Sequence, residues 1–145
     1  MATLRQLVEQ KIIDSDLGFK EVSGAADLSA IVENRLSIPG CYIFRTKANP
    51  GENELINAVS QQVNDTIALV VVTNNVRYLR GDDSSDENEV LCEKIQGVLL
   101  NFRPAEKYAP MVYSGGTLIT FKDGLFVWQE TYTTWGLISN NLIED

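Results

Sequence analysis

The strongest constraint on the fold is a short turn sequence near the C-terminus. Lys122-Asp123-Gly124 joins two runs rich in apolar residues, 111–121 and 125–138. An Asp-Gly pair between two such runs is among the strongest signals for a β-hairpin, because these residues tolerate the backbone angles of a tight turn. The sequence therefore predicts two antiparallel strands at this end of the chain.

Counting outward from a two-residue turn at Asp123-Gly124 predicts which side chains face one another. One side pairs Phe121 with Phe126, Ile119 with Trp128 and Thr117 with Glu130, and the other pairs Thr120 with Val127 and Leu118 with Gln129. The first side, with Tyr132, is an aromatic face suited to the core. Beyond Thr134 the phase changes, because Trp135 and Leu137 share the parity of Val127. Either a β-bulge re-aims the strand, or another subunit covers its outer residues, with or without a bulge.

Periodicity predicts the other elements. Helical spacing predicts amphipathic helices over 3–13 with Thr3 as N-cap, over 25–36, and over about four turns from a capping box of Ser84 and Glu87 to a stop before Pro104. Strands are predicted over 17–24, 41–48 and 57–75, with a polar loop over 47–56 built on Asn49-Pro50-Gly51. The apolar half of the third strand, 66–73, predicts a central strand covered on both faces, and the polar half is expected to extend as a ribbon.

These elements predict an α+β fold. We expect a mainly antiparallel sheet of four to five strands, with helices packed on one face and a C-terminal β-hairpin. A length of 145 residues suits one domain, which we place at 1–138, followed by a flexible C-terminal tail at 139–145.

Composition narrows the possible functions. A net charge of −8 argues against sequence-specific binding of nucleic acid, because phosphate binding needs a basic patch. Histidine is absent, which removes Ser-His-Asp and Cys-His catalysis and histidine metal sites. Cys41 and Cys92 are expected to be free buried thiols. No apolar run reaches the roughly 20 residues of a membrane span and no signal-like block opens the chain, so we expect a soluble protein without a membrane partner.

Three patterns that suggest chemistry have simpler explanations. The acidic residues at 82–89 lack the spacing of a Ca²⁺ loop and fit a helix start. The sequence "YSGGT" at 113–117 is not followed by the Gly-Lys-Ser/Thr of a phosphate loop, and fits a glycine bend or bulge in a strand. Carboxylate-only catalysis stays open in principle, but twenty acidic residues make chance pairs inevitable. We expect no catalytic, cofactor or metal site.

The order of these segments resembles the tail terminator, or tail completion, proteins of long-tailed bacteriophages. The resemblance rests on "IPGCYIF", on "QQVNDTIALVVVTNN" leading to "RYLRG", on the acidic helix start, and above all on "YSGGTLITFKDGLFVWQETYTTWGLI". Members of that family commonly show a Gly-Gly pair, an Asp-Gly turn and an aromatic-Trp-Gln-acid-x-aromatic strand. The matching positions are Gly115, Gly116, Asp123, Gly124, Trp128, Gln129, Glu130 and Tyr132, with Val127 where an aromatic residue is frequent.

This resemblance implies a non-enzymatic subunit of a ring, usually a hexamer, in the tail of the virion, assembled in the host cytoplasm. Such a ring caps the tail tube, stops polymerisation of the tube protein and offers a joining surface to a head-completion or connector protein. DNA could pass through it. The alternatives are a connector or stopper ring on the portal side, and a small cytosolic enzyme or ligand-binding domain.

Contacts with a neighbouring subunit or with the tube are expected on the loop 47–56, on the polar strand half and on the semi-polar face of the hairpin. The candidate residues are Asn49, Glu52, Asn53, Gln61, Gln62, Asn64, Gln129, Thr131 and Trp135.

Overall fold

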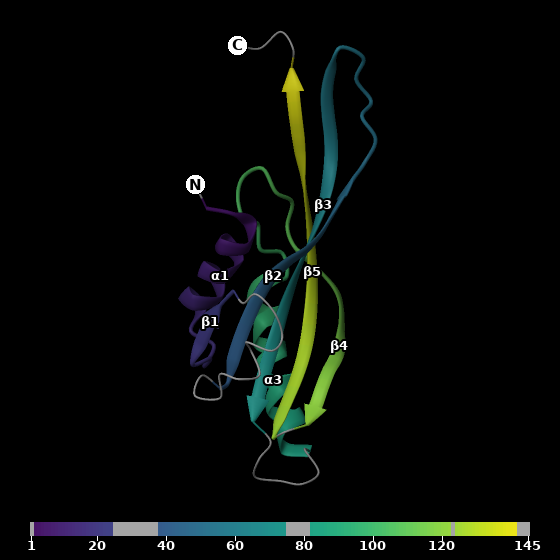
Figure 1. The fold of residues 1–145 in the computed structure, drawn as a ribbon. Helices are drawn as coiled ribbons and strands as arrows, with labels where there is room; N and C mark the ends of the chain where they lie inside the picture. Colours follow the sequence, from purple (N-terminus) through teal and green to yellow (C-terminus); the bar gives the residue numbers. More distant parts are fainter. Residues whose placement is uncertain (1, 25–37, 75–81, 123, 142–145) are drawn as a thin grey trace.

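The computed structural model describes residues 2–24, 38–74, 82–122 and 124–141 (Figure 1). In chain order the elements are α1 (Leu4–Ser15), β1 (Glu21–Ser23), β2 (Gly40–Pro50), β3 (Ala58–Asn74), α3 (Asp82–Leu99), β4 (Val112–Lys122) and β5 (Leu125–Asn141). The helix predicted over 25–36 lies outside the described residues. The strand predicted over 17–24 is shorter than expected, at three residues.

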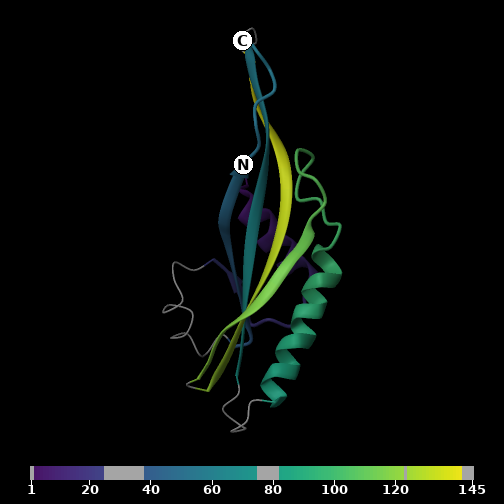
Figure 2. The same ribbon diagram turned by 90° about the vertical axis from the view of Figure 1, so that its right-hand side faces the viewer.

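Five strands form one sheet in the order β1-β2-β3-β5-β4. Only β1 and β2 are parallel, and the other neighbours are antiparallel. Helices α1 and α3 lie on the same face of this sheet, as Figure 2 shows. The predicted α+β fold, with its mainly antiparallel sheet and C-terminal hairpin, is confirmed.

The central strand β3 is buried on both faces of the sheet over residues 67–73, as its continuous apolar run predicts. Alternate residues Ile67, Leu69 and Val71 pack against α1 and α3 in the main core. On the opposite face, Val70 and Val72 join a second cluster with Tyr42, Leu125 and Val127. The body of the protein thus has apolar cover on both faces without a second subunit.

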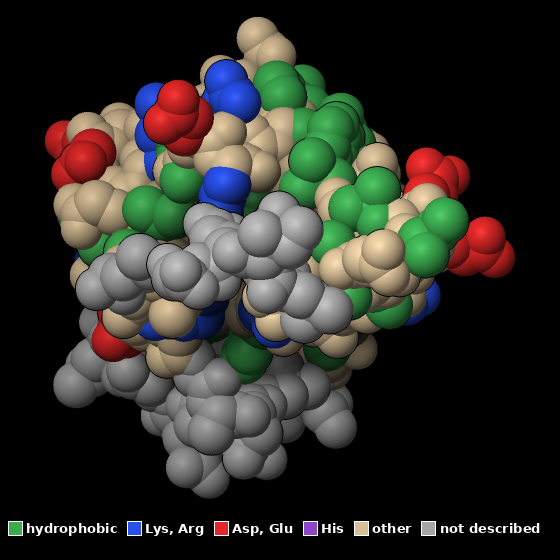
Figure 3. Space-filling view, turned by 90° about the horizontal axis from the view of Figure 1, so that it is seen from above, with side chains coloured by type: hydrophobic (Ala, Val, Ile, Leu, Met, Phe, Trp, Pro, Cys, Tyr) green, Lys and Arg blue, Asp and Glu red, His purple; other side chains and the backbone are tan. Residues whose placement is uncertain are grey.

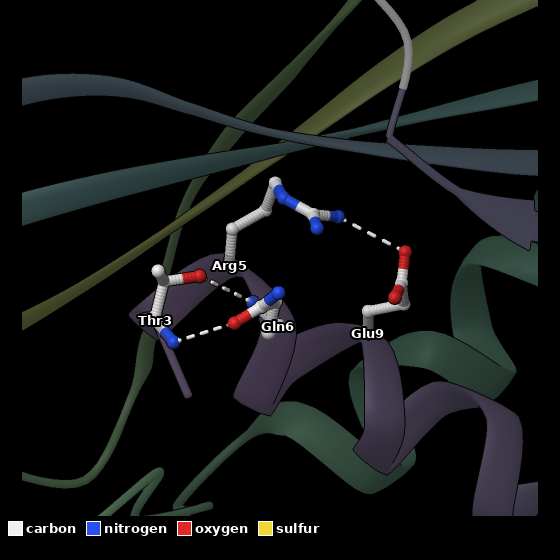
Figure 4. A network of polar contacts seen from close by, with 4 residues as sticks. All are labelled: Thr3, Arg5, Gln6 and Glu9. Carbon is white, nitrogen blue, oxygen red and sulfur yellow. Dashed lines mark hydrogen bonds and ion pairs between the residues drawn. The ribbon is translucent and has the colours of Figure 1, made fainter. Parts of the chain in front are cut away.

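The helix α1 begins as its sequence predicts. Thr3 Oγ1 accepts a hydrogen bond from the backbone N–H of Gln6 at 3.2 Å, and Gln6 Oε1 accepts one from the backbone N–H of Thr3 at 2.8 Å (Figure 4). This reciprocal pair satisfies two backbone donors that the first helical turn leaves without partners. Arg5 and Glu9 add an ion pair of 2.9 Å one turn further along.

The start of α3 differs from the prediction. The helix begins at Asp82, so Ser84 lies inside it and is not the N-cap, and the expected capping box with Glu87 is wrong. At 18 residues α3 has about five turns rather than four. Its buried apolar side chains are Leu91, Cys92, Ile95 and Leu99, with the polar Asn88 also buried, whereas Val90 is half exposed. A stripe of apolar residues shows which face of a helix packs on the core. Acidic residues are favourable anywhere in the first turn, so they do not show at which residue the helix begins.

The hairpin follows the predicted register for two pairs and then departs from it. Phe121 pairs with Phe126 and Thr120 with Val127, but Leu118, not Ile119, pairs with Trp128. Because of the register shift between Leu118 and Thr120, Gln129 pairs with Thr117 instead of Leu118. Glu130 likewise pairs with Gly116 instead of Thr117. A second shift lies between Tyr113 and Gly115. Both irregularities belong to β4, and β5 keeps an unbroken register with β3, which rules out the first of the two alternatives for β5, a bulge that re-aims the strand.

The outer parts of β2, β3 and β5 extend beyond the body of the molecule (Figure 1). We call residues 47–65 together with 134–141 the ribbon. Strand β2 continues to Pro50, so the polar loop begins at Gly51 and not at residue 47, and Asn49-Pro50 are strand rather than turn. Strand β5 continues to Asn141, which pairs with Ala58. Residues 139–141 therefore belong to the sheet and not to the tail predicted from 139 onward.

Candidate functional site

A buried carboxylate organises the residues of the C-terminal motif. Glu130 is only 2% exposed. Its Oε2 accepts hydrogen bonds of 2.9 Å from both Trp128 Nε1 and the Tyr113 hydroxyl, and its Oε1 accepts one of 3.1 Å from Gln96 Nε2. We call Glu130, Trp128, Tyr113 and Gln96 the Glu130 cluster. It ties β5 to the edge strand β4 and to α3, and supplies the donors that a buried carboxylate requires.

Gly116 makes room for this cluster. A Cβ atom at this position would lie 2.6 Å from Glu130 Oε2 and 2.8 Å from two atoms of the Trp128 ring. The neighbouring Gly115 has a φ of +127°, a backbone conformation that glycine adopts at little cost. The two glycines, the tryptophan and the acid of the motif therefore form one packed unit.

Burial alters the ionisation of the groups around the cluster. It raises the pKa of the Tyr113 hydroxyl to about 12, with the Glu130 carboxylate as the next cause. Burial, followed by the charges of Glu130 and Glu89, also raises the pKa of the Cys92 thiol to about 12. Cys41 is likewise free and buried, and burial raises its pKa. Both thiols are protonated at neutral pH, which makes them poor nucleophiles and poor metal ligands.

Within the part of the chain that the structure describes, no group of three or more cysteine and carboxylate side chains is placed to hold a metal ion. The described helices are also too short or too polar to cross a membrane. The Tyr132 hydroxyl is buried near Glu130 and has no hydrogen-bond partner.

The ribbon brings most of the predicted contact residues together. Asn49 pairs with Asn64 and Asn64 pairs with Trp135, so these three lie in one row across β2, β3 and β5. In the next row Gln62 pairs with Leu137. Trp135 is 43% exposed and Leu137 is 59% exposed, so apolar side chains stand among amides on this face. Figure 3 looks down on this end of the molecule and shows hydrophobic side chains at its surface.

Trp135 and Leu137 lie on the opposite side of β5 from Trp128, as the parity count predicts. The unbroken register of β5 removes the bulge as the reason for this change of phase. The outer half of the strand keeps its apolar residues although the body does not cover them.

Residues 4–140 match the sequence model of the phage tail terminator protein family. The chain belongs to this family. The match runs from the start of α1 almost to the end of β5 and so includes both the body and the ribbon. Comparison with curated proteins gives no match. As a member of a family of structural phage-tail proteins, this chain is a component of the virion tail.

Asn53 and Gln61, two of the predicted contact residues, form hydrogen bonds to the backbone of the chain itself. Asn53 Oδ1 accepts hydrogen bonds from the backbone N–H groups of Leu55 and Ser60, at 3.4 and 2.8 Å, and its Nδ2 donates to the carbonyl oxygens of Leu55 and Ala58. Gln61 Nε2 donates to the carbonyl oxygen of Gly51 at 2.8 Å. These two side chains hold the shape of the connection at 51–57, on which Glu52 is exposed.

Gln129 and Thr131 lie apart from the other candidates, in the body of the protein. Gln129 pairs with Thr117, and the Thr131 hydroxyl donates to the carbonyl oxygen of Gly115 at 2.9 Å. They share a side of β5 with Trp135 but are not on the ribbon.

The sequence reasoning named Trp135 and Leu137 on the outer part of β5 but did not single out the other apolar residues of the ribbon. Those more than one third exposed are Leu55, Ile56, Val59 and Ile138. Ile56 is 96% exposed. A signal for them was present, because Leu55-Ile56 is an apolar pair inside an otherwise polar segment, and such residues need a reason to be exposed.

Proposed function

We propose that this protein assembles into a ring, with six copies as the expected number, and that the ring caps the end of the tail tube. Capping ends the polymerisation of the tube protein and leaves a surface to which a head-completion or connector protein joins. The protein carries out no catalysis in this role, and it assembles in the host cytoplasm before it becomes part of the tail.

The observation that carries this proposal is the exposed apolar face of the ribbon. The body buries an apolar cluster on each face of its sheet, although the edge strand β4 also exposes Val112 and Leu118. The ribbon extends three strands past that body with Trp135, Leu137 and Ile138 each more than 40% exposed. Apolar side chains held in regular strands, rather than in a loop, are suited to a rigid protein–protein contact.

The two edges of the sheet support contacts of the ring type. One edge is β4, and no described strand pairs with its outer side. The other edge is formed by β1, which pairs with β2 only from Gly40 to Tyr42, so within the described residues the rest of β2 pairs with β3 alone. A contact that joins unlike edges of identical subunits is heterologous, and a heterologous contact forms a ring when its rotation closes after a whole number of subunits.

The proposal is tested with a charge on the ribbon. We expect the purified protein, alone or with tail tube protein, to form rings that light scattering and negative-stain images detect. Trp135→Glu should abolish them and leave the circular dichroism spectrum unchanged, because a carboxylate in an apolar contact is costly to desolvate. Val90→Glu is the matched control, since Val90 is also half exposed but lies on α3.

Two results would contradict the proposal at different levels. Rings that persist in Trp135→Glu would show that the ribbon is not the contact. A wild-type protein that stays monomeric and does not bind tube protein would overturn the capping function itself, and binding to a portal-bound adaptor instead would assign it to the connector.

A further inference from the structure

A cavity of about 340 Å³ lies between α3 and the sheet beside the Glu130 cluster. Side chains from α3 form one wall, and side chains of β4 and β5 form the other. Its lining residues are Asn88, Glu89, Cys92, Glu93, Gln96, Tyr113, Phe126, Trp128 and Glu130. The cavity lies at the β4 side of the sheet, in the body of the protein, whereas the ribbon contact proposed above involves the outer ends of β3 and β5.

The walls of this cavity combine aromatic rings with negative charge. Phe126, Trp128 and Tyr113 supply the rings. Glu89 and Glu93 are exposed at α3, and Glu130 is buried. Among the described residues, the lining includes neither lysine nor arginine. A space with this composition attracts a cation that has a flat or apolar surface, because ring faces and carboxylates both favour positive charge.

Glu130 has hydrogen bonds but no counter-charge. Its three donors are an indole, a phenol and an amide, all neutral. Among the described residues, the ion pairs join Arg5 to Glu9 and Arg45 to Asp65, and neither includes Glu130. A buried carboxylate gains most from a cationic partner, because the low dielectric around it strengthens the attraction.

We propose that this cavity binds an arginine side chain of another protein, with the guanidinium beside Glu130 and against the aromatic side chains of β4 and β5. Arginine fits better than lysine, because its planar guanidinium stacks on rings and donates to carboxylates in two directions at once. Glu89 and Glu93 lie on the α3 side of the same cavity and add to the attraction.

The arginine comes from a different protein because the described arginines of this chain are already engaged. Arg5 and Arg45 are in ion pairs, and Arg103 donates to the carbonyl oxygens of Glu106 and Tyr108 at 2.6 and 2.8 Å. A free organic cation and a second copy of this chain are alternatives that the experiment separates.

The experiment uses tryptophan fluorescence, because the chain has only two tryptophans. In a Trp135→Phe background Trp128 is the single reporter, and it lines the cavity. We expect the peptide acetyl-Gly-Arg-Gly-amide to change its emission saturably, with a dissociation constant of about 1 mM or lower. The citrulline peptide, which has the same shape without the charge, should bind at least about tenfold more weakly.

Variants locate the charge. Glu130→Gln keeps an acceptor oxygen and should weaken binding by about tenfold, and Glu89→Gln/Glu93→Gln, at exposed positions that do not threaten folding, should weaken it by about threefold. Glu106→Gln removes one charge from the exposed loop after α3 and should change nothing.

Equal binding of the citrulline peptide, or no loss of binding in both cavity variants, would overturn the proposal. Spermidine that binds more tightly than the arginine peptide would assign the cavity to a free cation instead. Self-association that Glu130→Gln abolishes would assign it to a second copy. None of these results depends on whether the protein caps a tube.

Discussion

At the scale of single residues, the two glycines of the C-terminal motif differ in what the sequence reveals about them. The Gly115-Gly116 pair predicts a bend or bulge, and the register shift next to Gly115 together with its φ of +127° confirms this. The need for Gly116 could not be predicted, because it comes from Trp128 and Glu130, which another strand places against it. A requirement that arises across strands has no local signal in the sequence.

Gly116→Ala should lower the free energy of unfolding by about 1–3 kcal/mol, because the new methyl group would displace the Glu130 carboxylate or the Trp128 ring. Gly97→Ala is the matched control. A Cβ at Gly97 meets nothing within 4 Å, and alanine is favoured inside a helix, so this variant should gain about 0.5–1 kcal/mol. Urea unfolding of both variants measures these free energies. Equal stabilities would show that the Glu130 cluster accommodates the added methyl group without cost.

At the scale of elements, the predictions succeeded where a pattern is continuous and failed where one strand takes an extra residue. The parity of β5 was right along its whole length because its pairing with β3 has no shift. The partner assignments failed beyond Thr120, because the irregularity at Ile119 lies in β4 and a count from the turn assumes equal steps on both strands. The capping box assigned to Ser84 failed for a related reason, since the spacing of two residues does not fix the first helical residue.

The connection at 51–57 gives a prediction for this scale. Asn53→Ala removes the acceptor for the amide of Ser60, so the amide hydrogens of Leu55 and Ser60 should exchange about five- to tenfold faster with solvent. The free energy of unfolding should change by less than about 1 kcal/mol, because the connection is exposed. Asn57→Ala in the same connection is the control for hydrogen exchange by NMR. Unchanged rates in Asn53→Ala would mean that other bonds hold this segment.

At the scale of the whole molecule, the α+β class followed from the hairpin and from the apolar stripes of α1 and α3, both of which repeat regularly. The ribbon followed from the polar first half of β3. The burial of β3 on both faces also followed from its apolar run, but the residues that pack on the second face did not, because Tyr42, Val70 and Val127 are far apart in sequence. The single-domain assignment and the interface residues stay predictions.

Net charge gives the prediction for the assembly. Each copy carries −8, so six copies would carry about −48, and their mutual repulsion opposes the proposed ring. We expect the ring fraction at constant protein concentration to rise as NaCl is increased from about 50 to about 500 mM, because salt screens exposed charges. Light scattering across this series measures it. A ring that dissociates as salt rises would show instead that attraction between opposite charges holds the contact.

The unbroken register of β5 has a mechanical consequence. Trp128 in the body and Trp135 on the ribbon lie on one strand, about 23 Å apart at about 3.3 Å per residue, and every residue between them is paired with β3. A strand held in this way has no hinge between its two ends. A force on the outer end, such as a pull by a neighbouring subunit on Trp135, is therefore transmitted along the strand to Glu130, and through its hydrogen bond with Gln96 to α3.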